Sequence, residues 1–240
     1  MLPCQGRCRE FESLRPLQRM KQIITIIMLL ICVPVHAGSY VLYDMEEHRV
    51  VESSNQTDIH PVASLTKLVT AMVCIDSGKC DQRLLERLLI RSDNNSAEEI
   101  AKKHSGGRSA FIRDMNNKVQ SIGLHETKFV DPSGLGVFNV STAREYIDVV
   151  IESEKYPLIK DISSSATIKH KKITLHNTNR ALLEGNLWGI ILSKTGFTSH
   201  AGRCLALVVQ SKKKYAIVIL GEKSIDKRIE LAKRLIKNTM

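Results

Sequence analysis

Three short groups of polar residues in this chain could together carry out acyl transfer. Ser64 and Lys67 are three positions apart, so a helix would bring a hydroxyl and an amine to one face. Ser92 and Asn94 add a second hydroxyl and a carboxamide, and the run Lys194-Thr195-Gly196 adds a cation beside a glycine. A nucleophile, a base and groups that hold the substrate are the parts that such chemistry needs.

The amine of Lys67 has to be uncharged for this chemistry. A serine hydroxyl is a weak nucleophile and needs a base that takes its proton. A lysine does this near neutral pH only when its pKa is lowered, and we expect burial and the nearby cation of Lys194 to lower it. The three groups must therefore meet in one crevice that excludes water.

Each group by itself is weak evidence. The pattern Ser-x-x-Lys also starts at Ser211 and at Ser224. Taken singly, Ser64 could be a helix-start residue, Asn94 a turn residue and Lys194 a solvated charge at a strand end. Together, and in this order, they favour a single functional site.

The elements that must position these groups follow from the apolar pattern. The predicted fold class is α+β: an antiparallel sheet of about five strands, formed by both ends of the chain, is packed by helices with a helical lobe. An amphipathic helix is expected at 225–237. Strand-like segments are expected at 39–43, 49–52, 167–175, 187–194, 204–209 and 215–220.

Two of the polar groups are expected on helix ends. A helix after Pro61 has Ser64 in its first turn, where backbone N–H groups are unpaired and the helix dipole is positive. The run Ser92-Asp93-Asn94 falls on a bend between two helices, and Asn95 or Ser96 is expected to cap the second.

Residues 1–37 are predicted to be a signal peptide, with export to the periplasm. Lys21 precedes an apolar run at 23–33, and Val35-His36-Ala37 offers small residues at the offsets that signal peptidase requires. The run is short for a membrane span, and an uncleaved anchor is the lesser alternative. Residues 1–19 do not fit the pattern and could be an overlong gene start. Residues 38–240 then form one domain.

The composition suits a globular domain of this size. The chain has 240 residues, of which 43% are hydrophobic and 25% charged, and a formal net charge of +10. A basic surface favours a polyanionic partner, such as an acidic wall polymer or nucleic acid, or serves solubility alone. The Cys and His spacings do not resemble a metal site, so neither a metal nor another cofactor is expected.

Export implies an oxidising compartment for the cysteines that remain after signal cleavage. Cys74, Cys80 and Cys204 are an odd number, which leaves at least one thiol free. Cys74 and Cys80 are near enough in sequence to pair, and whether they do stays open. Cys204 lies in an apolar stretch and is expected to be a buried small side chain.

With its three motifs the chain resembles the low-molecular-weight penicillin-binding proteins, the serine-type D-alanyl-D-alanine carboxypeptidases and endopeptidases. The likeness covers about 39–220 and is greatest to the penicillin-binding protein 7 group of endopeptidases, which lack an extra C-terminal β domain. The sequence segments that carry the likeness are P-V-A-S-L-T-K-L-V-T-A-M-V at 61–73, D-P-S-G-L at 131–135, N-V-S-T-A-R-E at 139–145 and L-S-K-T-G-F-T at 192–198.

The resemblance implies which residues are catalytic. Ser64 would attack a D-alanyl carbonyl and form an acyl-enzyme, and Lys67 would take its proton. Ser92 would relay the proton to the leaving amine. Water would then release the acyl group.

It also implies which residues bind the substrate. Asn94 would hold its amide, and Lys194 and Thr195 its carboxylate. Gly196 would let the strand backbone come close, and the N–H groups of Ser64 and Phe197 would form the oxyanion hole. The implied partners are peptidoglycan peptides and, as covalent inhibitors, β-lactams. Nucleic acid is not an implied partner, and contact with the membrane is expected only through the signal segment before its cleavage.

One departure from the family concerns the distance between the first two motifs. Ser64 and Ser92 are only 28 positions apart, so a β-rich excursion beside the site is expected to be missing. A Cys74–Cys80 disulfide would stiffen the shortened link. The alternative function is a catalytically impaired protein that still binds wall peptides or penicillin. A β-lactamase is less favoured, because the E-x-x-L-N string of class A enzymes is absent between the second and third motifs.

Overall fold

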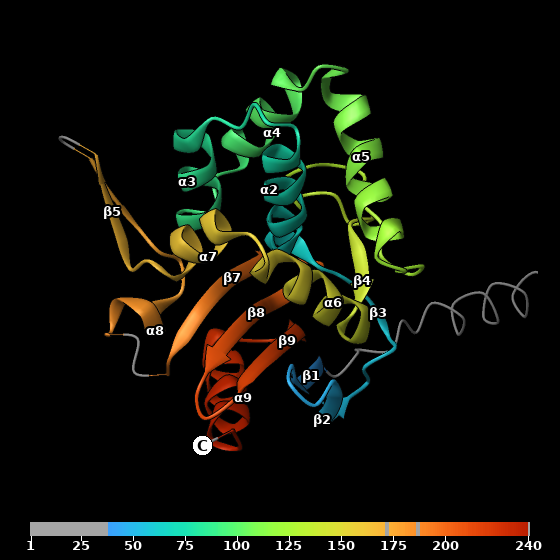
Figure 1. Cartoon of the computed structure of the whole chain (residues 1–240). Coiled ribbons are helices and arrows are strands. Elements are labelled where there is room, and N and C mark those ends of the chain that lie inside the picture. Colours follow the sequence, from blue (N-terminus) through green and yellow to red (C-terminus); the bar gives the residue numbers. More distant parts are fainter. Residues whose placement is uncertain (1–37, 171–172, 186–187, 240) are drawn as a thin grey trace, which may run out of the picture. The chain divides into compact units, whose positions relative to one another are not determined.

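The structure is a computed structural model that describes residues 38–170, 173–185 and 188–239 (Figure 1). The predicted signal peptide at 1–37 lies outside these residues. Within the described chain, a five-stranded antiparallel sheet has the strand order β2-β1-β9-β8-β7. Its strands are β1 (Ser39–Asp44), β2 (Arg49–Ser54), β7 (Ile190–Thr198), β8 (Gly202–Gln210) and β9 (Lys214–Glu222).

The two ends of the described chain meet in this sheet, as predicted. Val41 of β1 lies opposite Val218 of β9, and β9 pairs in turn with β8. Side chains alternate between the two faces of a strand, and here both faces are buried. Val218 belongs to the core under the helical lobe, whereas its neighbours Ile217 and Ile219 belong to a second core on the other face. The α+β prediction is confirmed.

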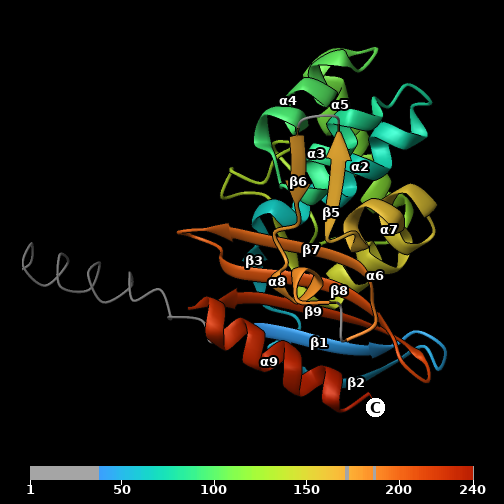
Figure 2. The same ribbon diagram turned by 90° about the vertical axis from the view of Figure 1, so that its left-hand side faces the viewer.

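Helices cover both faces of the sheet. α9 (Ile225–Lys237) lies across one face, where Leu235 and Ile236 are buried, and most of the other helices lie on the opposite side (Figure 2). The bounds of the latter are η1 (Ala63–Thr66), α2 (Lys67–Asp76), α3 (Gln82–Ile90), α4 (Asn94–Lys103), α5 (Gly107–Ser121), α6 (Ala143–Glu154) and α7 (Pro157–Ser164). A short helix, α8 (Arg180–Leu183), precedes β7, and β3 (Ile59–Pro61) pairs with β4 (Val140–Thr142).

The prediction of one strand at 167–175 is wrong. The segment forms a separate hairpin of β5 (Thr167–His170) and β6 (Ile173–His176), outside the main sheet. Its apolar residues are too few to bury a face, since Leu175 is buried but Ile173 is 61% exposed. The hairpin lies beside α3, where the ring of His170 hydrogen-bonds the carboxylate of Glu86.

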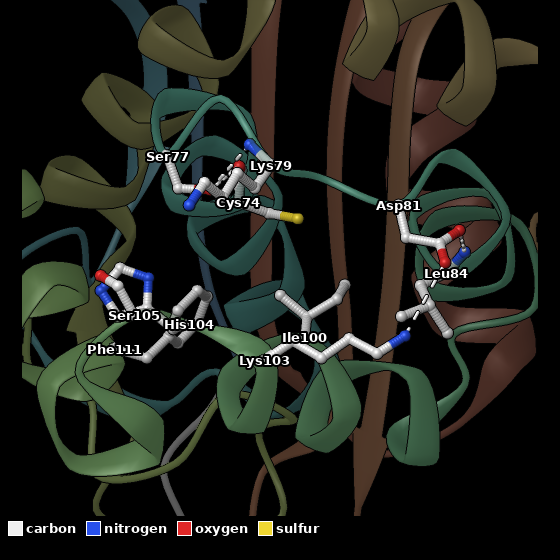
Figure 3. A pocket seen from close by; sticks show the side chains of 10 residues that line it. All are labelled: Cys74, Ser77, Lys79, Asp81, Leu84, Ile100, Lys103, His104, Ser105 and Phe111. Carbon is white, nitrogen blue, oxygen red and sulfur yellow. Dashed lines mark hydrogen bonds and ion pairs between the residues drawn. The ribbon is translucent and has the colours of Figure 1, made fainter.

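A disulfide joins Cys74 at the end of α2 to Cys80, just before α3, and Cys204 is a buried free thiol. The pairing that the sequence left open is therefore formed, and it brackets the shortened link between the first two motifs. A hollow of about 130 Å³ lies beside it (Figure 3). Of the residues that line it, Lys103 forms an ion pair with Asp81, and His104 contacts Asp114 outside the hollow. None of the residues predicted for the site is among the described residues of its lining.

Every helix in the described part of the chain falls short of the length and apolarity that crossing a bilayer requires.

Candidate active site

Ser64 and Lys67 lie at the junction of η1 and α2, one turn apart. The first turn is 3₁₀ rather than α, and Lys67 is the first residue of α2. The Nζ of Lys67 lies 2.8 Å from the Oγ of Ser64, 2.7 Å from the Oδ1 of Asn94 and 2.5 Å from the carbonyl oxygen of Ser133. An ammonium has three N–H donors, so each has one acceptor here.

The side chain of Lys67 is fully buried, and burial lowers its pKa to about 7. The carboxylates of Asp131 and Asp93 oppose this by favouring the charged form. Burial thus lowers the pKa of Lys67, as expected from the sequence. The repulsion between the two lysines contributes instead to the lowered pKa of Lys194.

The second motif forms the predicted bend between α3 and α4, but its cap differs from the prediction. Asp93, rather than Asn95 or Ser96, is the N-cap, and its carboxylate accepts the backbone N–H of Ser96 at 3.1 Å. Asn94 is therefore the first residue of α4. Ser92 has a φ of 58°, a left-handed conformation that costs a non-glycine residue about 1 kcal/mol or more.

The third motif lies on β7, the edge strand next to η1. The Nζ of Lys194 donates to the Oγ of Ser92 at 2.9 Å and to the carbonyl of Thr195 at 2.8 Å. A Cβ on Gly196 would lie 3.1 Å from the backbone nitrogen of Ser64, so a glycine lets the two segments approach. Phe197 follows and is half-exposed.

The ammonium of Lys194 is buried, and its pKa is held well below the usual range. Burial is the main cause, and repulsion from Lys67 and Arg228 adds to it. An anion that enters the site would offset this repulsion.

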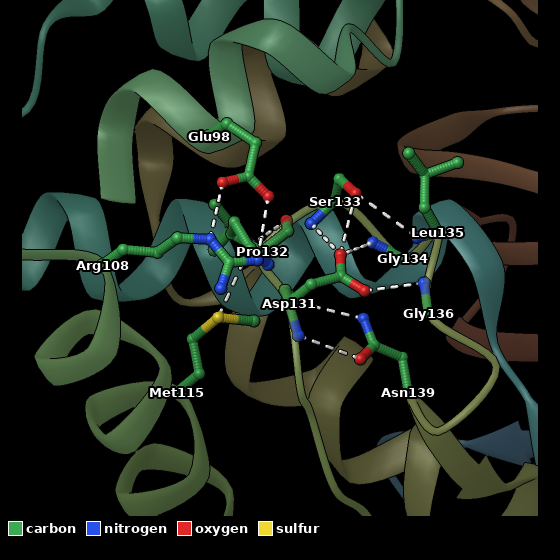
Figure 4. Close-up of polar contacts among 11 residues, drawn as sticks. Glu98, Arg108, Met115, Asp131, Pro132, Ser133, Gly134, Leu135, Gly136 and Asn139 are labelled. Atoms are coloured by element: carbon green, nitrogen blue, oxygen red, sulfur yellow. Dashed lines mark hydrogen bonds and ion pairs between the residues drawn. The ribbon is translucent and has the colours of Figure 1, made fainter. Parts of the chain in front are cut away.

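The loop from Asp131 to Asn139 helps to position Lys67, through the carbonyl of Ser133. The carboxylate of Asp131 accepts the backbone N–H groups of Ser133, Gly134 and Gly136, each at 2.7 Å, and the hydroxyl of Ser133 at 2.8 Å (Figure 4). Burial by itself would raise the pKa of Asp131, but these hydrogen bonds outweigh it and hold the pKa below its usual value. They also fix the Ser133 carbonyl that accepts from Lys67.

Asn139 ties this loop to η1. Its amide donates to the carbonyl of Asp131 at 2.9 Å and to the Oγ1 of Thr66 at 3.2 Å, and its Oδ1 accepts two backbone N–H groups. Sequence reasoning missed Asp131, Ser133 and Asn139 as parts of the site. The signal was the Asp-Pro-Ser-Gly turn, because an Asp side chain commonly bonds to the backbone two residues onward.

A hollow of about 290 Å³ opens beside Ser64. Ser64 of the first motif, Ser92 of the second and Thr195 of the third all line it, so the structure brings the three motifs to one cavity. Predicted residues in its lining are Ser64, Ser92, Thr195, Gly196 and Phe197. Three arginines also line it: Arg180, Arg203 and Arg228. The sequence analysis did not identify them as site residues, because they lie far apart in the chain.

Comparison with known proteins agrees with this arrangement. The chain matches the S11 peptidase family model, described as D-alanyl-D-alanine carboxypeptidase, over residues 31–83 and 79–224. The two matched pieces meet between the first two motifs, next to the Cys74–Cys80 disulfide, where the link is short. This is the position at which we expected a family segment to be missing.

Relatives and solved structures of the same kind are similar to the chain. It is 35% identical to a D-alanyl-D-alanine endopeptidase of Escherichia coli strain K12, over 78% of this chain and 71% of that protein. A D-alanyl-D-alanine endopeptidase of Pseudomonas aeruginosa is 33% identical over 71% of this chain and 66% of its own length.

The fold is also that of solved penicillin-binding proteins. Penicillin-binding protein D2 of Listeria monocytogenes superposes with a TM-score of 0.75 at 24% identity, covering 83% of this chain and 95% of that one. The Streptomyces K15 DD-transpeptidase gives a TM-score of 0.77 at 21% identity, covering 84% of this chain and 95% of its own. By its family match and its relatives, the chain belongs to the S11 family of serine-type D-alanyl-D-alanine peptidases.

Proposed function

We propose that the protein hydrolyses D-alanyl peptide bonds of wall peptides through an acyl-enzyme on Ser64, and that penicillins acylate the same residue. The observation that carries this is the set of contacts around the Lys67 amine. When Lys67 is neutral, its two N–H groups can stay on Asn94 and Ser133. Its lone pair then points at the hydroxyl of Ser64 and can take that proton.

The remaining residues have roles that follow from their places. Backbone N–H groups of Ser64 and Phe197 would stabilise the developing oxyanion, at about 3 kcal/mol for each donor. Ser92, held by Lys194, would return the proton to the leaving amine. Thr195 would bind the substrate carboxylate.

The substrate amide would meet the side of Asn94 that Lys67 does not use. The Oδ1 of Asn94 accepts from Lys67, and its amide N–H groups can donate to a substrate carbonyl. Asn94 would thus hold both the base and the substrate. This double role explains why a carboxamide suits the position better than a carboxylate, which has no donor.

The short link between the motifs bears on the choice among functions. Ser92 lines the same hollow as Ser64 and bonds Lys194, so the link has not drawn it out of reach. This favours an active peptidase over a protein that only binds its ligand. We further propose that residues 1–37 are a signal peptide, that 38–240 form the catalytic domain and that the protein works in the periplasm.

A labelling experiment tests this function. Fluorescent penicillin should label the wild-type protein and fail to label Ser64→Ala, because the acyl bond needs the Ser64 oxygen. Cross-linked wall peptides should be cleaved by the wild type, read by chromatography. Labelling without any cleavage would mean a binding protein, and rapid nitrocefin turnover would mean a β-lactamase.

A further inference from the structure

A second hollow, of about 410 Å³, lies at the bend between α3 and α4 (Figure 1). We call it the bend hollow, and its described lining residues come from the end of α3 and from the bend: Arg87, Arg91, Ser92, Asp93, Asn94 and Asn95. Ser92 also lines the hollow beside Ser64, so the two hollows meet at this residue. A peptide held at Ser64 that passes Ser92 therefore enters the bend hollow.

The contacts of Asn94 indicate which part of a substrate would reach the bend hollow. Its Oδ1 accepts from the Nζ of Lys67 at 2.7 Å, and Asn94 also lines the bend hollow, with amide N–H groups that can hold a substrate carbonyl. In the proposed mechanism Thr195 binds the carboxylate of the leaving residue. The acyl side of the substrate, which stays on Ser64 after the first step, then runs the other way, past Asn94.

Arg91 is the unbalanced charge of the bend hollow. It is the exposed C-cap of α3, and its side chain forms no ion pair or hydrogen bond within the described part of the chain. Arg87, by contrast, lies 3.1 Å from the Oδ2 of Asp93. Asp93 is the one carboxylate among the described lining residues, and it also accepts from the hydroxyl and the backbone N–H of Ser96. One of the two cations is therefore offset, and the other is free for a ligand.

The chemistry of the bend hollow fits an anionic group better than an apolar one. Its described lining residues are all polar or charged. Arg87 and Arg91 are four positions apart at the end of α3, so they lie on one face of the helix, one turn from each other. A guanidinium is planar and always charged, and its paired N–H groups match the two oxygens of a carboxylate.

We infer that Arg91, supported by Arg87, forms a subsite for a carboxylate on the acyl side of the substrate. The ligand class is an acidic peptide whose carboxylate precedes the scissile D-alanyl bond. Arg91 would determine specificity without taking part in the reaction, because it contacts a part of the substrate that does not react. The contact would persist in the acyl-enzyme, since the acyl side stays bound to Ser64.

The inference rests on the proposed function, and a matched pair of substrates tests it separately. Both are cross-linked peptide dimers with the same leaving peptide. In one dimer the acyl-side carboxylates are free, and in the other they are amidated. We expect the wild-type enzyme to show a kcat/KM about fivefold higher for the free-acid dimer, a modest effect because Arg91 is exposed. This preference should shrink as salt is added, because salt screens exposed charges.

Substitutions of Arg91 should change the preference in a graded way. Arg91→Gln should remove most of it, and Arg91→Glu should reverse it, because a carboxylate in the bend hollow would repel the free-acid dimer. Arg83→Gln is the matched control. Arg83 is exposed on the same helix, eight positions before Arg91, and it is not among the described residues that line the bend hollow. Its replacement removes the same charge, and the preference should survive.

Several outcomes would overturn the subsite. One is a wild-type enzyme that cleaves both dimers equally, or whose preference does not respond to salt. Another is an equal loss on both dimers in Arg91→Gln, which would mean that Ser92 has been misplaced. A third is an equal loss of preference in Arg83→Gln, which would indicate long-range attraction. In all of these, penicillin still labels Ser64 of the wild type and the proposed function stands. If Ser64 is not labelled and neither dimer is cleaved, the proposed function fails and the subsite with it.

Discussion

In the proposed mechanism the chemistry depends on Lys67, and its surroundings explain how a lysine would serve as a base. Its three acceptors fix the nitrogen in one place, and burial lowers its pKa to about 7. About half of the molecules would then carry a neutral amine at neutral pH. The two nearby aspartates, Asp131 and Asp93, keep the pKa from falling further.

The rate of penicillin acylation should follow the neutral fraction of Lys67. Below pH 7 we expect the second-order labelling rate to rise about tenfold per pH unit, and above about pH 8 to level off. Labelling at a series of pH values measures this. A rate that is flat from about pH 5.5 to 8.5 would contradict a lysine base with this pKa.

The same pKa shift has a consequence for stability. The pKa of Lys67 is lowered on folding, so between pH 7 and its ordinary value of 10.5 the unfolded chain binds more protons than the folded one. The contribution of this residue to the free energy of unfolding therefore rises with pH across that window. The lowered pKa thus costs stability at neutral pH, and in the proposed mechanism it makes the amine available as a base.

Among the elements, the loop at 131–139 and the turn η1 must interlock for the site to form. Gly134 has a φ of +85°, and a Cβ on it would lie 1.9 Å from the carbonyl oxygen of Ala63. Ala63 itself has a left-handed φ of 47°. Glycine adopts its φ without strain, so the strained residue is Ala63, next to Ser64, and the Asp131 and Asn139 hydrogen bonds hold the loop against it.

A pair of glycine variants separates backbone strain from close packing. Gly123 has a φ of +83°, and a Cβ there would have no neighbour within 4 Å in the described part of the chain, whereas a Cβ on Gly134 would meet Ala63. Gly123→Ala should cost about 1–2 kcal/mol of unfolding free energy and keep penicillin labelling. Gly134→Ala should cost more and lose labelling, because the loop must move away from η1. Urea unfolding and labelling of both variants measure this, and equal effects would contradict it.

At the scale of the molecule, the sheet is held between two cores, and the site lies at its β7 edge. The core under the helical lobe contains α2 and α6, and the other lies under α9. Since both faces of the central strands are buried, neither core is dispensable. Thr195, Gly196 and Phe197 of the edge strand β7 line the cavity.

The second core should contribute substantially to stability. Leu235 of α9 is fully buried against the sheet, whereas Leu158 of α7 is 44% exposed. Leu235→Ala should lower the free energy of unfolding by about 2–5 kcal/mol, through lost burial and a cavity. Leu158→Ala should change it by about 1 kcal/mol or less. Denaturant unfolding of both variants checks this, and a small effect at Leu235 would mean that α9 packs loosely.

The sequence by itself determined the parts of the site and most of the elements. Ser64, Lys67 and Lys194 were predicted as one site from their types, spacing and order and from the family resemblance, and the structure brings the three motifs together. The strands β1 and β9 and the helix α9 followed from apolar periodicity, which records burial directly. The separate hairpin at 167–176 was not predicted, because short apolar runs do not specify their partners.

Only the tertiary structure decided what surrounds Ser64 and Lys67. The Ser133 carbonyl that accepts from Lys67 comes from a loop 66 residues away in the chain. Arg203 and Arg228 approach the site from β8 and α9, and their isolation in sequence gives no sign of it. Burial, which sets the pKa of Lys67 and of Lys194, is a property of the packed whole. Local sequence fixes which groups are available, and long-range packing fixes how strongly each holds its proton.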